Sequence, residues 1–179
     1  TGGIDFDASA LTGNLTVDFT GATGNDLING GDGDDDITIS AGQDAVDGGA
    51  GDDTITNAAG NDLVTLGAGD DTFVLVTAFG AAPTPADDGD DSVTDFAAGD
   101  AIQLAANTLF ADGTGDLTNN GACTDDKIDI SNDGTDTTIF IDVDTDAAEA
   151  TCVEVTLDGV EFDNPDFTYD ATDELLTLQ

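Results

Sequence analysis

The sequence predicts an all-β protein built around a right-handed parallel β-roll of three coils. Two observations support the roll. Residues 21–74 divide into six consecutive nine-residue units without insertion or deletion. Every unit has glycine at its fourth position, aspartate at its sixth and a hydrophobic residue at its eighth. The flanking sequence contains short segments of alternating polarity, which we expect to form β caps at both ends of the roll.

Each unit is expected to form a turn over its first six positions and a short strand over its last three. Because side chains alternate along a strand, the eighth residue points inward. The predicted core residues are Ile28, Ile37, Val46, Ile55, Val64 and Phe73. Composition alone would also allow a disordered segment rich in glycine and aspartate. The unbroken phase of the hydrophobic positions favours the roll.

The turn residues that all six units share are typical of a calcium site. Glycine accepts positive φ and lets backbone carbonyls approach a cation closely. Calcium binds roughly six to eight oxygens, which carboxylates and carbonyls supply. The sixth-position aspartates are Asp26, Asp35, Asp44, Asp53, Asp62 and Asp71.

The repeat G-G-x-G-x-D-x-hydrophobe-x resembles that of the repeat-in-toxin (RTX) family of calcium β-rolls. Within that family the chain is most similar to surface-layer proteins exported by type I secretion and to C-terminal modules. The resemblance implies that two units form one coil and that calcium lies between turns of successive coils. One turn would supply the carbonyls of its first and third positions, the next those of its second and fourth, and both the sixth-position aspartate. The implied metal ligands are Gly30, Asp32, Asp35, Gly48, Gly49, Ala50, Gly51, Asp53, Gly67, Gly69, Asp71, Gly21, Thr23, Asp26, Gly42, Asp44, Gly60 and Asp62.

These turns fall on two edges of the roll. We call them the glycine edge, with turns starting at Gly30, Gly48 and Leu66, and the substituted edge, with turns starting at Gly21, Ile39 and Asn57. Three turns per edge enclose two gaps, which predicts about four interior calcium ions. Tighter binding is expected on the glycine edge. Ile39 and Ser40 count against calcium binding in the middle of the substituted edge, because a β-branched residue disfavours positive φ.

The segments around the repeats suggest the domain limits. Residues 1–20 are predicted to be capping strands, 21–78 the roll, 79–92 an acidic loop or linker, and 93–179 a C-terminal β-module. The linker contains two prolines and four aspartates, which favours a solvated loop, with a further cation site as the alternative. Residues 91–107 resemble the segment that follows RTX arrays, with the spacing D-x-x-x-D-F-x-x-G-D-x-I-x-L.

Two features of the C-terminal module carry chemistry. Asp142, Asp144 and Asp146 form an acidic run that is a candidate set of oxygen ligands, with an ordinary acidic hairpin tip as the alternative. Cys123 and Cys152 are the two cysteines of the chain, and we expect them to form a disulfide in an extracellular protein. Two buried or free thiols are the alternative.

Composition excludes several functional classes. Forty acidic residues against one basic residue give a formal charge of −39, which opposes binding to nucleic acid or to anionic membrane surfaces. The chain has no histidine, no G-x-S-x-G motif and no phosphate-binding loop, so we do not expect an enzyme. No apolar stretch approaches the roughly 18 residues of a membrane span. The initiator methionine is also missing, which indicates a processed chain or a fragment.

Two functions fit these observations. The first is an extracellular calcium-binding structural protein, such as a surface-layer, matrix or filament subunit, that folds and self-assembles into a homo-oligomer or polymer and could attach to the cell surface. The second is a C-terminal calcium-dependent folding and secretion module of a larger RTX enzyme or adhesin. The acidic, then hydrophobic C-terminus resembles the RTX secretion signal, which implies a secreted or cell-surface location. Leu27 and Leu63 are candidate contact residues, or ordinary surface leucines.

Overall fold

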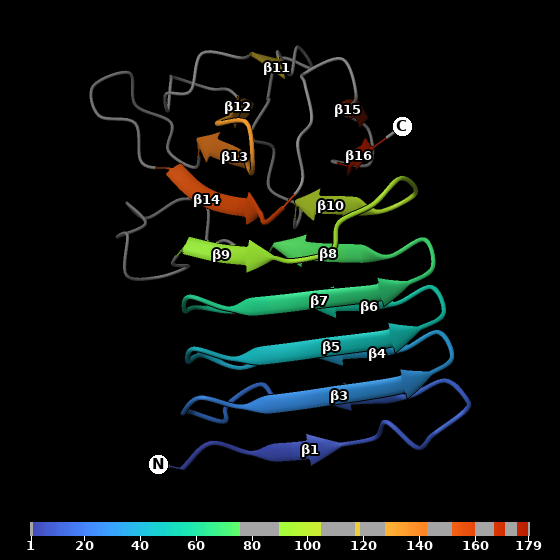
Figure 1. The fold of residues 1–179 in the computed structure, drawn as a ribbon. Helices are drawn as coiled ribbons and strands as arrows, with labels where there is room; N and C mark the ends of the chain where they lie inside the picture. Colours follow the sequence, from blue (N-terminus) through green and yellow to red (C-terminus); the bar gives the residue numbers. More distant parts are fainter. Residues whose placement is uncertain are drawn as a thin grey trace.

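The computed structural model describes residues 2–75, 90–104, 117–118, 128–142, 152–159, 167–170 and 175–178. The secondary structure of these ranges consists of β-strands, with no helix among them. They form two sheets, one lying behind the other, and the strands of each sheet are stacked along the molecule (Figure 1). The predicted all-β parallel roll is therefore confirmed.

The strand order shows how the chain winds. The first sheet has the order β1 (Asp5–Asp7), β3 (Leu27–Asp32), β5 (Ala45–Ala50), β7 (Leu63–Ala68), β9 (Asp90–Val93), β14 (Cys152–Leu157), β13 (Thr137–Asp142), β12 (Ile128–Asn132) and β11 (Leu117–Thr118). The second sheet has the order β15 (Phe167–Asp170), β16 (Leu175–Leu178), β10 (Ala101–Leu104), β8 (Thr72–Leu75), β6 (Thr54–Thr56), β4 (Asp36–Thr38) and β2 (Thr16–Asp18). From β1 to β10 the strands alternate between the sheets, so each coil adds one parallel strand to each sheet.

The core lies between the two sheets. Strand register aligns the eighth positions of successive coils, as in the pairs Ile28 with Val46 and Ile37 with Ile55. All six predicted core residues are buried, with exposed fractions of 0–3%. This part of the prediction is confirmed, because the nine-residue period places the same position inside in every coil.

The first position of two units holds a core residue that the prediction did not include. Ile39 and Leu66 occupy it and are buried in the same core. The objection to Ile39 assumed that this position requires a positive φ. Gly21, at the same position of the preceding turn on this edge, has a φ of 95°, but Gly30 and Gly48 on the glycine edge do not adopt a positive φ, so the first position does not require one. A branched side chain at the first position therefore adds to the core of the roll.

The roll extends beyond the six repeats at both ends. At the start, Phe6 pairs with Ile28 and Val17 with Ile37. After the repeats, Val93 pairs with Val64 and Ile102 with Phe73, so the partners differ by 29 in residue number instead of 18. The extra residues lie between β8 and β9, and β9 begins inside the range assigned to the linker.

The C-terminal strands continue the same two sheets. β14 pairs in parallel with β9, and β16 pairs antiparallel with β10. Ile139, Val155, Leu157, Leu176 and Leu178 are buried in the same hydrophobic cluster as the roll. The described part of the C-terminal region thus covers the last coil and shares its core.

Gly49 offers a test of how closely the coils are packed. Its φ is 115°, and a Cβ at this residue would collide with the carbonyl oxygen of Gly31 in the preceding coil. We expect Gly49→Ala to lower the free energy of unfolding by about 2 kcal/mol or more, since positive φ alone costs roughly 1–2 kcal/mol and the clash adds to it. Urea denaturation in excess calcium measures the loss.

Gly13→Ala is the matched control for this substitution. Gly13 has no neighbouring atom within 4 Å of its ideal Cβ position and no positive φ. Its replacement should change the free energy of unfolding by no more than about 0.5 kcal/mol. Equal urea midpoints for the two variants would show that the coils tolerate a side chain at Gly49.

Candidate metal centre

The sixth-position aspartates form two buried columns, one on each edge of the roll. In both columns, Oδ1 of each aspartate accepts a hydrogen bond from the backbone N–H of the corresponding residue one coil earlier. On the glycine edge the successive residues are Leu15, Asp35, Asp53, Asp71 and Asp100, joined at 2.7–3.0 Å. On the substituted edge they are Ile4, Asp26, Asp44, Asp62 and Asp91, joined at 2.7–3.0 Å.

The second carboxylate oxygen of most of these residues has no hydrogen-bond partner. Among the described residues, the buried atoms without a partner include Oδ2 of Asp35, Asp44, Asp53, Asp62 and Asp71. A buried polar atom is normally paired, and an unpaired charged one is costly. The single basic residue of the chain, Lys127, lies outside the described residues, so no side-chain cation among those residues can neutralise the columns. These unpaired oxygens therefore indicate a candidate binding site for a cation.

Backbone oxygens lie next to the unpaired carboxylate oxygens. A Cβ on Gly30 would lie 2.6 Å from Asp35 Oδ2 and would collide with the carbonyl oxygen of Gly48 in the next coil. Gly48 has the same relation to Asp53 Oδ2 and to the next carbonyl oxygen. No group of three acidic side chains suited to a metal occurs in the described ranges, so a cation would also need these carbonyls. Hard carboxylate and carbonyl oxygens fit calcium.

Other predicted ligands lie in the expected turns or beside them. Gly49 and Gly67 pair in the first sheet, and the carbonyl oxygen of Ala50 accepts the N–H of Gly33 at 2.6 Å. The side chain of Asp32 is exposed, which leaves its carbonyl as the group that could bind metal. On the substituted edge, Thr23 forms an isolated parallel bridge with a residue of the next turn.

Three predicted residues lie outside the described ranges. These are Asp144 and Asp146 of the acidic run and Cys123 of the expected disulfide. The cation site at the acidic run and the disulfide to Cys152 therefore stay predictions.

Two aspartates that follow the repeats continue the columns, and a third lies beside the glycine edge, although the repeat pattern did not include them. Asp91 and Asp100 take the place of the sixth-position residue in the last coil, as shown by the bonds from Asp62 and Asp71. Asp95 accepts the N–H groups of residues 66 and 67 at 2.8 and 2.9 Å. A signal was present, since Asp91 precedes Val93 and Asp100 precedes Ile102 by the same two residues as in the repeat.

The substituted edge differs from the glycine edge in its side-chain donors. The hydroxyl of Ser40 donates to Asp26 Oδ2 at 2.9 Å, and the amide nitrogen of Asn57 donates to Asp91 Oδ2 at 2.6 Å. Two of the carboxylates on this edge are therefore paired by the protein itself.

Burial changes the proton affinity of the columns. Desolvation raises the pKa of Asp53, Asp62 and Asp71 to about 6 in each case. Neighbouring acidic residues raise these pKa values further, while the accepted backbone hydrogen bond opposes the shift. The same cause raises the pKa of Asp44 and Asp100.

These shifts predict how stability and calcium affinity depend on pH. In the metal-free fold these three carboxyl groups stay protonated up to about pH 6, whereas in the unfolded chain they release their protons near pH 4. Their contribution to the stability of the metal-free fold is therefore present below about pH 4 and is lost as pH rises through about 6. Calcium must displace these protons, so its affinity should fall as pH drops below about 6. Titration calorimetry at pH 5 and 7.5, with protein stripped on a chelating resin, measures the affinity. Equal affinities at both pH values would contradict the prediction.

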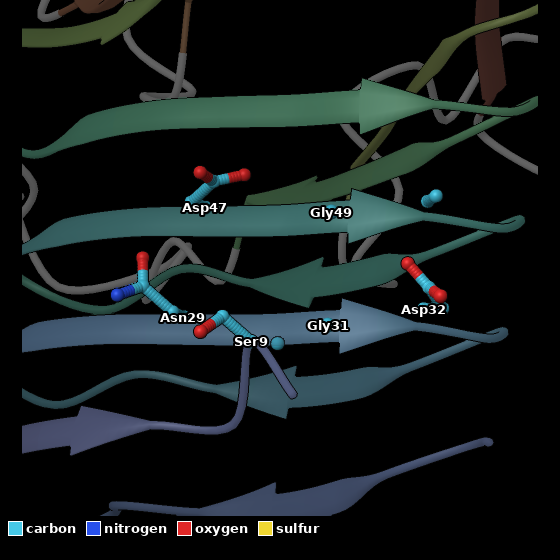
Figure 2. Close-up of a pocket in the computed structure, with 8 residues that line it drawn as sticks. Ser9, Asn29, Gly31, Asp32, Asp47 and Gly49 are labelled. Carbon is cyan, nitrogen blue, oxygen red and sulfur yellow. The ribbon is translucent and has the colours of Figure 1, made fainter. Parts of the chain in front are cut away.

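A shallow hollow lies on the outer face of the first sheet, away from the core (Figure 2). It forms over β3 and β5 because Gly31 and Gly49 have no side chains, and Asn29, Asp32 and Asp47 stand around it. The two carboxylates are exposed to solvent and so resemble ordinary surface groups rather than the unpaired oxygens of the columns.

The fold and the site define a parallel β-solenoid with aspartate columns between its coils. Comparison with solved structures gives similar proteins. The R2 subunit of the mannuronan C5-epimerase from Azotobacter vinelandii has a TM-score of 0.51 and 26% identity, over 80% of this chain and 85% of that chain. The R3 subunit of the epimerase is 25% identical over 83% of this chain and 72% of that chain, at a TM-score of 0.29.

Sequence comparisons add no family assignment: no family model matches the chain, and no curated protein does. In the part of the chain that the structure describes, no helix has the length and apolar character to cross a membrane.

Proposed function

We propose that this chain is an extracellular calcium-binding module whose roll is completed by calcium. The observation that carries the proposal is the set of five buried Oδ2 atoms without a partner. Calcium would supply positive charge to these carboxylates and accept the nearby carbonyl oxygens as further ligands. Five unpaired oxygens support about five ions, rather than the roughly four that the repeats alone predict.

The proposed ligands follow the two columns. On the glycine edge, ions would lie between the turns of Asp35 and Asp53, Asp53 and Asp71, and Asp71 and Asp100. On the substituted edge, the unpaired oxygens belong to Asp44 and Asp62. Each site would pair carboxylates of successive coils with turn carbonyls, as the RTX resemblance implies.

An extracellular location fits the physical chemistry. Extracellular calcium modules bind with dissociation constants of roughly 10⁻⁴ to 10⁻³ M. Binding that occurs only in the folded state stabilises that state by mass action, so a chain of this kind would remain unfolded at low calcium and fold after export.

Two roles are compatible with such a module. Similarity to the R2 subunit, which is part of a larger enzyme, supports a folding module within a longer secreted protein. The edge strand β1 also carries Asp5 and Asp7, and charged residues on a short edge strand discourage pairing with other chains. Self-assembly is the second candidate, and the exposure of Leu27 and Leu63, at 47% and 49%, favours it.

Sedimentation velocity with and without calcium tests the proposal and separates the two roles. A folding module should become compact with calcium and remain monomeric at micromolar protein concentration. A structural subunit should become compact and then associate, reversibly on chelation, because bound calcium reduces the repulsion between chains. A sedimentation coefficient unaffected by calcium would contradict both roles.

A further inference from the structure

The carboxylate of Asp26 differs from its counterparts in the repeats. All six sixth-position aspartates accept a backbone hydrogen bond through Oδ1, but only Asp26 Oδ2 has a partner, the Ser40 hydroxyl at 2.9 Å. Both residues are buried, with exposed fractions of 3% and 2%. The two residues belong to successive turns of the substituted edge, so their hydrogen bond spans the gap between those turns.

Ser40 occupies the second position of its repeat. On the glycine edge this position holds Gly31, Gly49 and Gly67, which have no side-chain donor. The aspartates of the glycine-edge repeats all have an unpaired Oδ2. The partnered state of Asp26 therefore coincides with a hydroxyl at the second position of the following turn.

The Ser40 hydroxyl lies where calcium would otherwise be needed. On the glycine edge, Oδ2 of Asp35 lies close to a carbonyl oxygen of the following coil, at the gap between two turns. In the corresponding gap of the substituted edge, the hydroxyl hydrogen of Ser40 points at the carboxylate oxygen. A cation at the same oxygen would face the positive end of the O–H bond and would have to displace it.

Building on the proposed calcium function, we propose that Ser40 replaces a calcium ion in the gap between the turns of Asp26 and Asp44. This gap is closed by a hydrogen bond within the chain and takes no metal. Ser40 thus excludes calcium from this gap of the substituted edge, and Asp44 contributes to one ion instead of two.

Calcium stoichiometry of Ser40 variants tests this inference. Equilibrium dialysis with radioactive calcium should show one more ion per chain for Ser40→Ala and Ser40→Gly than for the wild type, because both variants leave Asp26 Oδ2 unpaired. Ser40→Thr keeps a hydroxyl and should bind the wild-type number. Ser9→Ala is the matched control, since the Ser9 hydroxyl donates to the exposed carboxylate of Asp7 at 2.6 Å. It should leave the stoichiometry unchanged.

The outcomes separate this inference from the proposed function. An unchanged or reduced number of ions in Ser40→Ala and Ser40→Gly would overturn it, the second result showing that the hydroxyl oxygen is itself a ligand. Failure of both variants to fold at saturating calcium would overturn it as well, because no ion then takes the vacated place. A wild-type chain that binds no calcium would instead refute the proposed function on which the inference rests.

Discussion

Removal of calcium should unfold most of the β-structure at neutral pH. Five buried carboxylate oxygens lack a partner in the protein, and each such group costs on the order of 1–3 kcal/mol or more when it is charged. Their sum is comparable to the whole stability of a typical domain, about 5–15 kcal/mol. The formal charge of −39 adds repulsion within the chain. Far-ultraviolet circular dichroism during titration with a chelator at pH 7.5 should show loss of the strand signal.

Two controls separate coordination from screening of charge. Sodium chloride at matched ionic strength screens repulsion without supplying ligand contacts, so it should not restore the strand signal. Magnesium should substitute poorly, because it demands near-octahedral geometry and gives up its water reluctantly. A strand signal that survives chelation, or that returns with sodium chloride alone, would contradict calcium-dependent folding.

Substitution of Asp53 should weaken calcium binding more than any change on the substituted edge. Asp53 lies in the middle of the glycine edge, between Asp35 and Asp71, and its Oδ2 is unpaired. Asp53→Ala removes a carboxylate that faces two gaps, and loss of one charged contact costs roughly 1.5–3 kcal/mol. A decrease in calcium affinity of about 10- to 100-fold is therefore expected by titration calorimetry.

Asp44→Ala is the matched comparison. Asp44 has the same backbone bonds, to Asp26 and Asp62, and also has an unpaired Oδ2. It faces one calcium gap if Ser40 closes the other, so its replacement should cost less affinity than that of Asp53. Equal losses in the two variants would show that both edges bind calcium alike.

The sequence by itself determined the repeating part of the roll. A strict nine-residue period means that the same position meets its counterpart 18 residues later in every coil. The buried eighth positions, such as Ile28 and Val46, and the two aspartate columns follow from that period alone. Local repetition is readable because the strand register and the Oδ1 hydrogen bonds repeat from one coil to the next.

Only the tertiary structure decided where the roll ends and which carboxylates lack partners. Asp91 and Asp100 join the columns at a separation of 29 residues, because an insertion between β8 and β9 breaks the period without breaking strand pairing. The N-terminal strands join at separations of 22 residues (Phe6 to Ile28) and 20 residues (Val17 to Ile37), because the segments before the repeats do not follow the nine-residue period. Whether Asp26 is paired depends on the direction of one buried hydroxyl, that of Ser40, and the packing of the turns fixes that direction. A periodic pattern records spacing along the chain, whereas these contacts depend on how turns of different length come together in space.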